Sequence, residues 1–387
     1  MRVAYTNGLV ITPNERFLGG VIVEGERIAN VFRGTLSESV DQTIDLCGAY
    51  LAPGFIDLHV HGAGGADFSS ANPDDYETAA KLHLRHGTTA LMPTISSTPI
   101  DTMKKALRAY RAAKDKSGMP MFLGAHMEGP YFAPEQAGAQ DPKVIRNPLP
   151  EEYLPFLDEF SDCIGRWSNA VELPGALEMG LELRKRGILA CLGHSDATYD
   201  QIMPALDYGY TMMTHFYSGM AGVRRINAYR HAGAVETGYL MDEFDVEIIA
   251  DGHHLPASLL KLIYKTKGSG RICLITDAIA GAGMPDGTVF ADDAVPYIVE
   301  NGVGKLLDRS AFAGSVSTSN LLIKTMVEEA EVPLCDAVKM LTLTPARIAG
   351  VDAEMGSLVP GKLANIVAFD ADYQVQSVMV KGQVVEL

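Results

Sequence analysis

The chain has 387 residues, a formal net charge of −16 and 47% hydrophobic residues. This length exceeds the usual size of one compact unit and fits a domain of roughly 250 residues with a smaller one beside it. The acidity argues against nucleic acids and anionic membrane surfaces as partners, because both carry negative charge.

The sequence also bears on the compartment. It contains no run of about 20 consecutive apolar residues, and its first residues lack the apolar centre of a signal peptide. The five cysteines are scattered and form no C-x-x-C pair, which favours reduced thiols over a disulfide framework. We therefore expect a cytoplasmic protein.

Both ends of the chain are rich in short strands and turns. Residues 21–31 predict a hairpin around Gly25-Glu26, and residues 364–369 and 377–380 predict further strands near the C-terminus. We expect both termini, residues 1–53 plus 355–387, to build one small β-sandwich domain.

Between the two ends, short apolar runs alternate with helical patterns. The runs cover residues 54–60, 88–94, 121–128, 165–172, 188–194, 211–215, 246–251 and 271–277. Helical patterns cover residues 74–86, 100–116, 175–186, 256–267 and 319–330. Eight strand–helix units predict an α/β fold, a (β/α)₈ barrel of the TIM type over residues 54–354. A doubly wound open sheet is the alternative, but no glycine-rich dinucleotide loop follows the first run.

Residues that bind metals or transfer protons fall at the ends of these runs. They are His59, His61, Glu128, His194, His215 and Asp277. The carboxyl ends of barrel strands meet at one mouth, so we expect these side chains to converge there. His59 and His61 should face the same way, since side chains alternate along a strand.

Imidazoles and a carboxylate are the donors that a borderline-soft divalent ion prefers. We therefore expect His59, His61, Glu128, His194 and His215 to hold metal, with Zn²⁺ favoured, Fe²⁺ or Mn²⁺ as alternatives, and one or two ions per chain. An ion with an open coordination position would hold and acidify a water molecule. A carboxylate must then take a proton from this water and give it to the leaving amine. Asp277 is the candidate.

Several motifs together resemble a known family. They are PGFIDLHVHG, HMEGPYF, GHSDAT, THFYSGM, ADGHH and the TDA at 276–278. The chain resembles the amidohydrolase superfamily and, within it, the N-acetylglucosamine-6-phosphate deacetylase family, over nearly its whole length. The resemblance implies removal of acetate from N-acetylglucosamine-6-phosphate to give glucosamine-6-phosphate in amino-sugar catabolism, and a homodimer whose neighbouring chain completes the phosphate site.

The resemblance also implies roles. Glu128, His194 and His215 would bind the primary ion, and His59 with His61 would bind a second ion or complete the site. Asp277 would act as general base and then acid, and His254 would polarise the acetyl carbonyl or contact the sugar. The residues expected to contact the amino-sugar phosphate are Ala139, Gln140, Ser218, Gly219, Arg225, His254, Phe312, Ala313 and Gly314.

The sequence departs from the family at three places, one of which is Gln140, where some relatives have histidine, although glutamine also resembles the family pattern there. Ser218-Gly219 stands where many relatives carry Asn-Ala, and the R-E-P-G segment with its phosphate-binding arginine is missing. Arg224, Arg225 or Arg230 could supply the guanidinium, which suits bidentate phosphate binding; solvated surface arginines are the alternative. The same mechanism on N-acetylgalactosamine-6-phosphate or another N-acylated amine is therefore a second hypothesis. A non-catalytic scaffold is a third, although it predicts damaged ligands and the sequence shows none.

Two further residues have a simpler interpretation. The single tryptophan, Trp167, is expected in the core. His126 precedes Glu128 by two positions, and either supports the site from behind or is a core residue.

Overall fold

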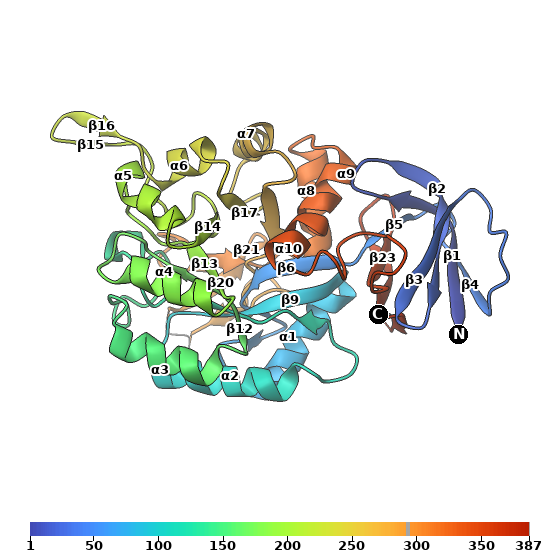
Figure 1. Cartoon of the computed structure of the whole chain (residues 1–387), viewed down its shortest axis with the longest axis horizontal. Coiled ribbons are helices and arrows are strands. Elements are labelled where there is room, and N and C mark those ends of the chain that lie inside the picture. The colour runs from blue at the N-terminus through green and yellow to red at the C-terminus, as the bar shows by residue number, and fades with distance from the viewer. Residues whose placement is uncertain (292–294, 387) are drawn as a thin grey trace.

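The computed structural model describes residues 1–291 and 295–386 and consists of a barrel with a curled sheet beside it (Figure 1). Around the barrel, the strands in the described part of the chain are β6 (Phe55–Val60), β9 (Thr88–Ile95), β11 (Ala125–Glu128), β12 (Ile164–Asn169), β13 (Leu189–Leu192), β14 (Tyr210–Met213), β17 (Asp245–Ile249) and β18 (Ile272–Ile275). The short β10 (Met121–Phe122) pairs with β9 just before β11. Each of the eight apolar runs forms a strand, so the predicted barrel is confirmed.

The barrel is nearly closed where β18 meets β6. Just beyond the strand ends, the backbone N–H of Asp277 donates to the carbonyl of His59 at 2.9 Å, and that of His61 donates to Ala278 at 2.8 Å. These two bonds join the first and the last strand at the carboxyl end of the barrel. They therefore fix the relative position of three of the residues that the sequence assigns to the site.

Helices cover the outside of the barrel (Figure 1). The predicted helical patterns correspond to α1 (Pro73–Arg85), α2 (Ile100–Ala113), α4 (Ala176–Lys185), α7 (Ala257–Lys267) and α8 (Ser319–Glu328). The other helices of the described residues are α3 (Pro150–Phe160), α5 (Tyr199–Ile202), α6 (Ala234–Leu240), α9 (Leu334–Met340) and α10 (Leu343–Ile348). The start of helix α1 follows directly from its sequence. The side chain of Asn72 accepts from the N–H of Asp74, and Pro73 occupies the first turn, where its missing N–H costs nothing.

The side chains that fill the barrel interior change from apolar to polar along the barrel axis. Toward the amino ends it is filled by apolar side chains that include Ile56, Met92, Cys191, Met212 and Cys273. Nearer the carboxyl ends, fully buried polar side chains replace them: His59, His126, Arg166, Ser168, Thr214 and Glu247. Buried polar groups need partners, so this layer is a hydrogen-bonded support beneath the barrel mouth.

Both chain termini build the second sheet (Figure 1). Its strands in the described residues are β1 (Arg2–Ile11), β2 (Arg16–Glu24), β3 (Arg27–Arg33), β4 (Gln42–Asp45), β5 (Tyr50–Pro53), β23 (Ile366–Phe369), β24 (Val375–Val380) and β25 (Gln383–Val385). The predicted hairpin is confirmed as β2 and β3. The sheet curls until the N–H of Ile28 donates to Lys362, enclosing a core that includes Val21, Leu51 and Ile366. The exact domain limits, 1–53 plus 355–387 and 54–354, stay a prediction.

Two insertions lie at the barrel mouth. The hairpin of β15 (Arg224–Ile226) and β16 (Tyr229–His231) projects away from the barrel (Figure 1). After β18, a small antiparallel sheet contains β19 (Val289–Phe290), β20 (Tyr297–Glu300), β21 (Val303–Leu306) and β22 (Phe312–Ser315). Strand β22 is tied to the strand end, because the N–H of Ser315 donates to the carbonyl of Asp277 at 3.0 Å. In the part of the chain that the structure describes, no helix is long and apolar enough to cross a membrane.

Trp167 lies in the core, as predicted, and is completely buried in β12. Its ring stacks on Tyr131 at a centroid distance of 5.9 Å and meets the edge of Phe156 at 5.4 Å. Its indole N–H donates to the carbonyl of Gly129 at 2.9 Å. The side chain therefore anchors the backbone directly after Glu128.

Replacing Trp167 with Phe should lower the free energy of unfolding by about 1–3 kcal/mol, because the Gly129 carbonyl loses its partner and a small cavity opens. Urea denaturation followed by circular dichroism measures this, since the variant has no tryptophan fluorescence. Leu18→Met is the control: Leu18 is 56% exposed and its replacement should change stability by less than about 0.5 kcal/mol. A Trp167→Phe protein as stable as the wild type would contradict the anchoring role.

Candidate metal centre

The five expected metal ligands meet at the carboxyl end of the barrel. His59 lies in β6 with His61 just after it, Glu128 ends β11, and His194 and His215 follow β13 and β14 by two residues. All five are buried. Their donor atoms form two groups, His59–His61–Glu128 and Glu128–His194–His215, and within each group the atoms lie within 4.8 Å of one another. The structure thus brings together every ligand that the sequence named, and Glu128 belongs to both groups.

Sharp turns direct these side chains into the mouth. His194, His215 and Asp277 have φ angles of 48°, 27° and 48°, in the left-handed region that L-residues rarely adopt. Each such residue costs on the order of 1–3 kcal/mol, and such strain is concentrated at functional sites. The strained residues follow directly on rigid strands, so the ladder holds them in place.

Hydrogen bonds determine which nitrogens are free to bind metal. The Nδ1 atom of His194 lies 2.7 Å from the carbonyl of Gln136, and that of His215 lies 3.1 Å from the carbonyl of Ser218. Carbonyl oxygens only accept, so both Nδ1 atoms carry a proton, and Nε2 is the nitrogen of each ring that is left to bind a cation. These two Nε2 atoms are 3.1 Å apart, and that of His215 is 3.0 Å from Glu128 Oε1. Lone pairs that face each other at this distance repel. A cation bound between them removes this repulsion, because each lone pair then coordinates the cation.

The donor atoms of the second group lie equally close together. The Nε2 atoms of His59 and His61 are 3.2 Å apart, and they lie 3.4 and 3.3 Å from the two oxygens of Glu128. The Nδ1 atom of His61 is 2.9 Å from Ser96 Oγ, which orients the ring. The residues of both groups therefore fit one divalent ion, or two that share Glu128.

Asp277 lies beside both groups. Its Oδ1 is 3.2 Å from His61 Nε2 and 3.3 Å from His59 Nε2. Burial alone would raise the pKa of Asp277, but the positive charge that His59 and His61 carry when no ion is bound, together with the hydrogen bond from His61, lowers that pKa to about 2. The carboxylate is therefore ionised at neutral pH, the form that accepts a proton.

A cavity of about 260 Å³ opens over these groups. Besides metal-binding residues and Asp277, its walls contain Ala139, Gln140, Ser218, Gly219, His254, Phe312, Ala313 and Gly314. Nearly all of the residues expected to contact substrate thus line one space.

The exception is Arg225, which lies exposed on the projecting hairpin and does not line this cavity. Arg230, on the other strand of the hairpin, is also exposed, and Arg224 forms an ion pair with Asp196 at the hairpin base. Among the described residues of this chain, no arginine lines the cavity.

Two cavity residues have specific partners. The amide of Gln140 donates to Glu128 Oε2 at 2.8 Å, so this side chain orients the shared ligand. The Nδ1 of His254 lies 2.7 Å from the carboxylate of Asp251. Burial lowers the pKa of His254, but the Asp251 carboxylate more than compensates and raises it overall. Asp251 belongs to the ADGHH motif but was not among the residues predicted for the site, and its contact with Nδ1 orients the His254 ring.

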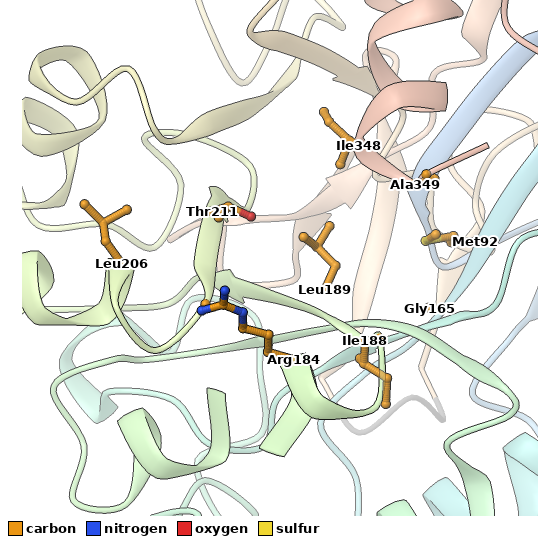
Figure 2. A pocket seen from close by; sticks show the side chains of 12 residues that line it. Met92, Gly165, Arg184, Ile188, Leu189, Leu206, Thr211, Ile348 and Ala349 are labelled. Atoms are coloured by element: carbon orange, nitrogen blue, oxygen red, sulfur yellow. The ribbon is translucent and has the colours of Figure 1, made fainter. Parts of the chain in front are cut away.

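A larger cavity of about 460 Å³ lies at the opposite end of the barrel, at the amino ends of β12, β13 and β14 (Figure 2). Its walls are mostly aliphatic side chains and glycines, with Arg184 and Thr211 as polar members. Of the described residues that line it, none is an imidazole or a carboxylate. Both groups of potential metal ligands lie at the other end of the barrel.

The Amidohydrolase family model matches residues 50–385. The chain belongs to the amidohydrolase family. Among its relatives, the N-acetylglucosamine-6-phosphate deacetylase of Haemophilus influenzae is 35% identical over 94% of this chain and 93% of its own length. The N-acetylgalactosamine-6-phosphate deacetylase of Escherichia coli O157:H7 is 34% identical over 86% of this chain and 87% of its own. The family resemblance seen in the motifs is confirmed.

Solved structures agree with this placement of the chain among the amidohydrolases. The N-acetylglucosamine-6-phosphate deacetylase of Pasteurella multocida superposes with a TM-score of 0.91 at 31% identity, covering 99% of both chains. A mutant of the Mycobacterium smegmatis deacetylase in complex with N-acetyl-D-glucosamine-6-phosphate gives 0.90 at 30% identity, covering 100% of this chain and 99% of that one. The amidohydrolase family is metal-dependent, in keeping with the two ligand groups.

Because Glu128 belongs to both groups, Glu128→Gln should weaken divalent-ion binding by at least about tenfold at either group. Elemental analysis of protein equilibrated with limiting Zn²⁺ measures the bound ion per chain. Glu152→Gln is a matched control, because Glu152 pairs with Arg146 away from the mouth. Unchanged zinc content in Glu128→Gln would show that the ligand groups are not the metal site.

Proposed function

We propose that this amidohydrolase removes acetate from N-acetylglucosamine-6-phosphate to give glucosamine-6-phosphate. The observation that carries the proposal is the set of facing acceptor atoms on Glu128, His194 and His215, next to the ionised Asp277 in a sugar-sized cavity. The names of the relatives supply the substrate. Zn²⁺ is the favoured ion for this ligand set, Fe²⁺ and Mn²⁺ are the alternatives, and one or two ions bind per chain. We place the enzyme in the cytoplasm.

The residues divide the chemistry among them. A divalent ion held by Glu128, His194 and His215 would supply Lewis acidity for the acetyl carbonyl and the attacking water. Asp277 accepts a proton from this water as its oxygen adds to the carbonyl carbon, and then gives the proton to the nitrogen as the C–N bond breaks. His254, oriented by Asp251, donates a hydrogen bond from Nε2 to the carbonyl oxygen or to the sugar.

The direct test is acetate release from N-acetylglucosamine-6-phosphate by protein loaded with Zn²⁺, Mn²⁺ or Fe²⁺. Asp277→Asn should lower kcat by roughly 10²–10⁴-fold, because the amide cannot accept the proton, while elemental analysis should find the metal still bound. Failure of the wild type to release acetate with any of the three metals would refute the proposed function.

The amino-sugar epimer is a second question. The relative that acts on N-acetylgalactosamine-6-phosphate is about as similar to the chain as the glucosamine enzymes are, so the same mechanism on that epimer, or on another N-acylated amine, is the alternative. The non-catalytic scaffold is disfavoured, because the ligand groups are complete.

We also propose a homodimer in which the β15–β16 hairpin serves the neighbouring site. Three apolar side chains are exposed on the hairpin and on the residue that leads into it: Val223 by 56%, Ile226 by 39% and Tyr229 by 76%. Such an apolar surface suits a protein contact. It also presents Arg225 and Arg230 to solvent, whereas the cavity of the same chain contains no arginine among its described residues. An arginine of the partner's hairpin would then meet the 6-phosphate in a bidentate manner.

Under this arrangement, Arg225→Met or Arg230→Met should raise KM for the 6-phosphate substrate by at least about tenfold, the loss of a charge-assisted contact. The kcat/KM for unphosphorylated N-acetylglucosamine should stay the same, because only the phosphate contact is lost. Arg108→Met, on the outer helix α2, is the control. If both hairpin variants keep the wild-type KM, the hairpin does not bind phosphate.

A further inference from the structure

A completely buried ion pair lies directly beneath the metal centre. Arg166 of β12 and Glu247 of β17 are both 0% exposed, and their side chains pair across the barrel interior. An apolar pair of similar volume is often as stable as a buried ion pair or more so, because both charges must leave water. Stability alone therefore does not account for two charges inside the barrel.

The contacts of the pair lead to the metal ligands. Oε2 of Glu247 lies 3.4 Å from His59 Nδ1 and accepts from the backbone N–H of His215 at 3.3 Å. Arg166 donates to Oε2 of Glu247 at 3.0 Å and to the carbonyl of Leu58, the residue before His59, at 3.3 Å. The pair thus contacts one residue from each ligand group and the backbone beside it.

These contacts decide the tautomer of His59. An ionised carboxylate only accepts hydrogen bonds, so a proton must lie on His59 Nδ1. When His59 releases its other proton to bind an ion, the lone pair lies on Nε2, which faces His61 Nε2 at 3.2 Å and Glu128. Without an acceptor at position 247, the proton is free to move to Nε2, where it blocks coordination. Carboxylate–histidine pairs orient metal ligands in this way.

We propose that Glu247, held by Arg166, is a positioning residue that keeps His59 in its metal-binding tautomer and thereby allows the His59–His61–Glu128 group to take a second divalent ion. This inference rests on the proposed metal-dependent function. It predicts that occupancy of the second ion depends on a hydrogen-bond acceptor at position 247, and not on the buried charges themselves.

Two double variants separate these contributions. Arg166→Met with Glu247→Met removes the charges and the acceptor. Arg166→Met with Glu247→Gln removes the charges but keeps a carbonyl oxygen, because the amide is free to turn toward His59 once Arg166 is gone. Met and Gln have similar shapes, so the two variants differ mainly in the acceptor. Circular dichroism checks that both are folded.

The readout is the zinc content per chain by elemental analysis, together with the electron paramagnetic resonance spectrum of the manganese-loaded protein. The wild type and the Met/Gln variant should bind two ions, with the spectrum of a coupled pair. The Met/Met variant should bind the second ion about 10–100-fold more weakly and show the spectrum of an isolated ion. Acetate release is measured in parallel.

Each outcome decides the matter. Two tightly bound ions in both double variants, or loss of the second ion in both, overturns the acceptor role of Glu247. A wild type that binds one ion and releases acetate overturns the inference and leaves the proposed function intact, whereas a wild type that binds no ion and releases no acetate overturns both. If the double variants do not fold, proton NMR of the zinc-loaded wild type decides: it should show a downfield imidazole N–H signal that His59→Gln abolishes, and its absence counts against the proposal.

Discussion

The site depends on one constraint, which is that acceptor atoms from different strands are held against one another. His194 and His215 each donate a hydrogen bond from Nδ1 to a backbone carbonyl. Their Nε2 atoms then lie 3.1 Å apart beside the oxygen of Glu128. Left alone, these groups would repel and move apart. The parallel ladder of β11, β13 and β14 prevents this, and it also holds His194 and His215 at positive φ. The barrel therefore preorganises a site that a cation stabilises, so that ion binding and folding stability are linked.

The layer beneath the mouth explains how the barrel tolerates such a site. Asp57 accepts from the backbone N–H groups of His59 and Thr276 and from the Thr276 hydroxyl, which ties the first strand to the strand that carries Asp277. His126, whose role the sequence left open, lies between Thr94 and Ser168 and meets the ring of His59 edge-on at 4.4 Å. It therefore supports the site from behind, and each of its ring nitrogens has a partner.

The eight strands and the ligand set could be predicted because their signals are local. An apolar run that ends in His, Glu or Asp is visible in a few residues, and barrel geometry brings the ends together. The supporting groups were not predictable in the same way. Arg166 and Glu247 are visible only as charges inside apolar runs, and their pairing joins residues 81 positions apart. Arg225 failed to reach the cavity of its own chain for a related reason. A guanidinium is suited to phosphate binding, but the hairpin that carries Arg225 turns at Asn227 and Ala228, both at positive φ, and Arg225 does not line the cavity.

Within Ser218-Gly219, where the chain departs from the family pattern, Gly219 lies close to His194 of the candidate metal centre. Gly219 has a φ of +59°, and a Cβ there would lie 2.9 Å from His194 Nδ1 and 3.3 Å from the carbonyl of Gln136. Those two atoms form the hydrogen bond that fixes the tautomer of His194. With this backbone, a side chain at position 219 would displace the partner of a metal ligand before it reached a substrate. The choice of sugar would then depend on the rest of the cavity wall, such as Phe312 and Ala313, and on the chain that supplies the phosphate contact.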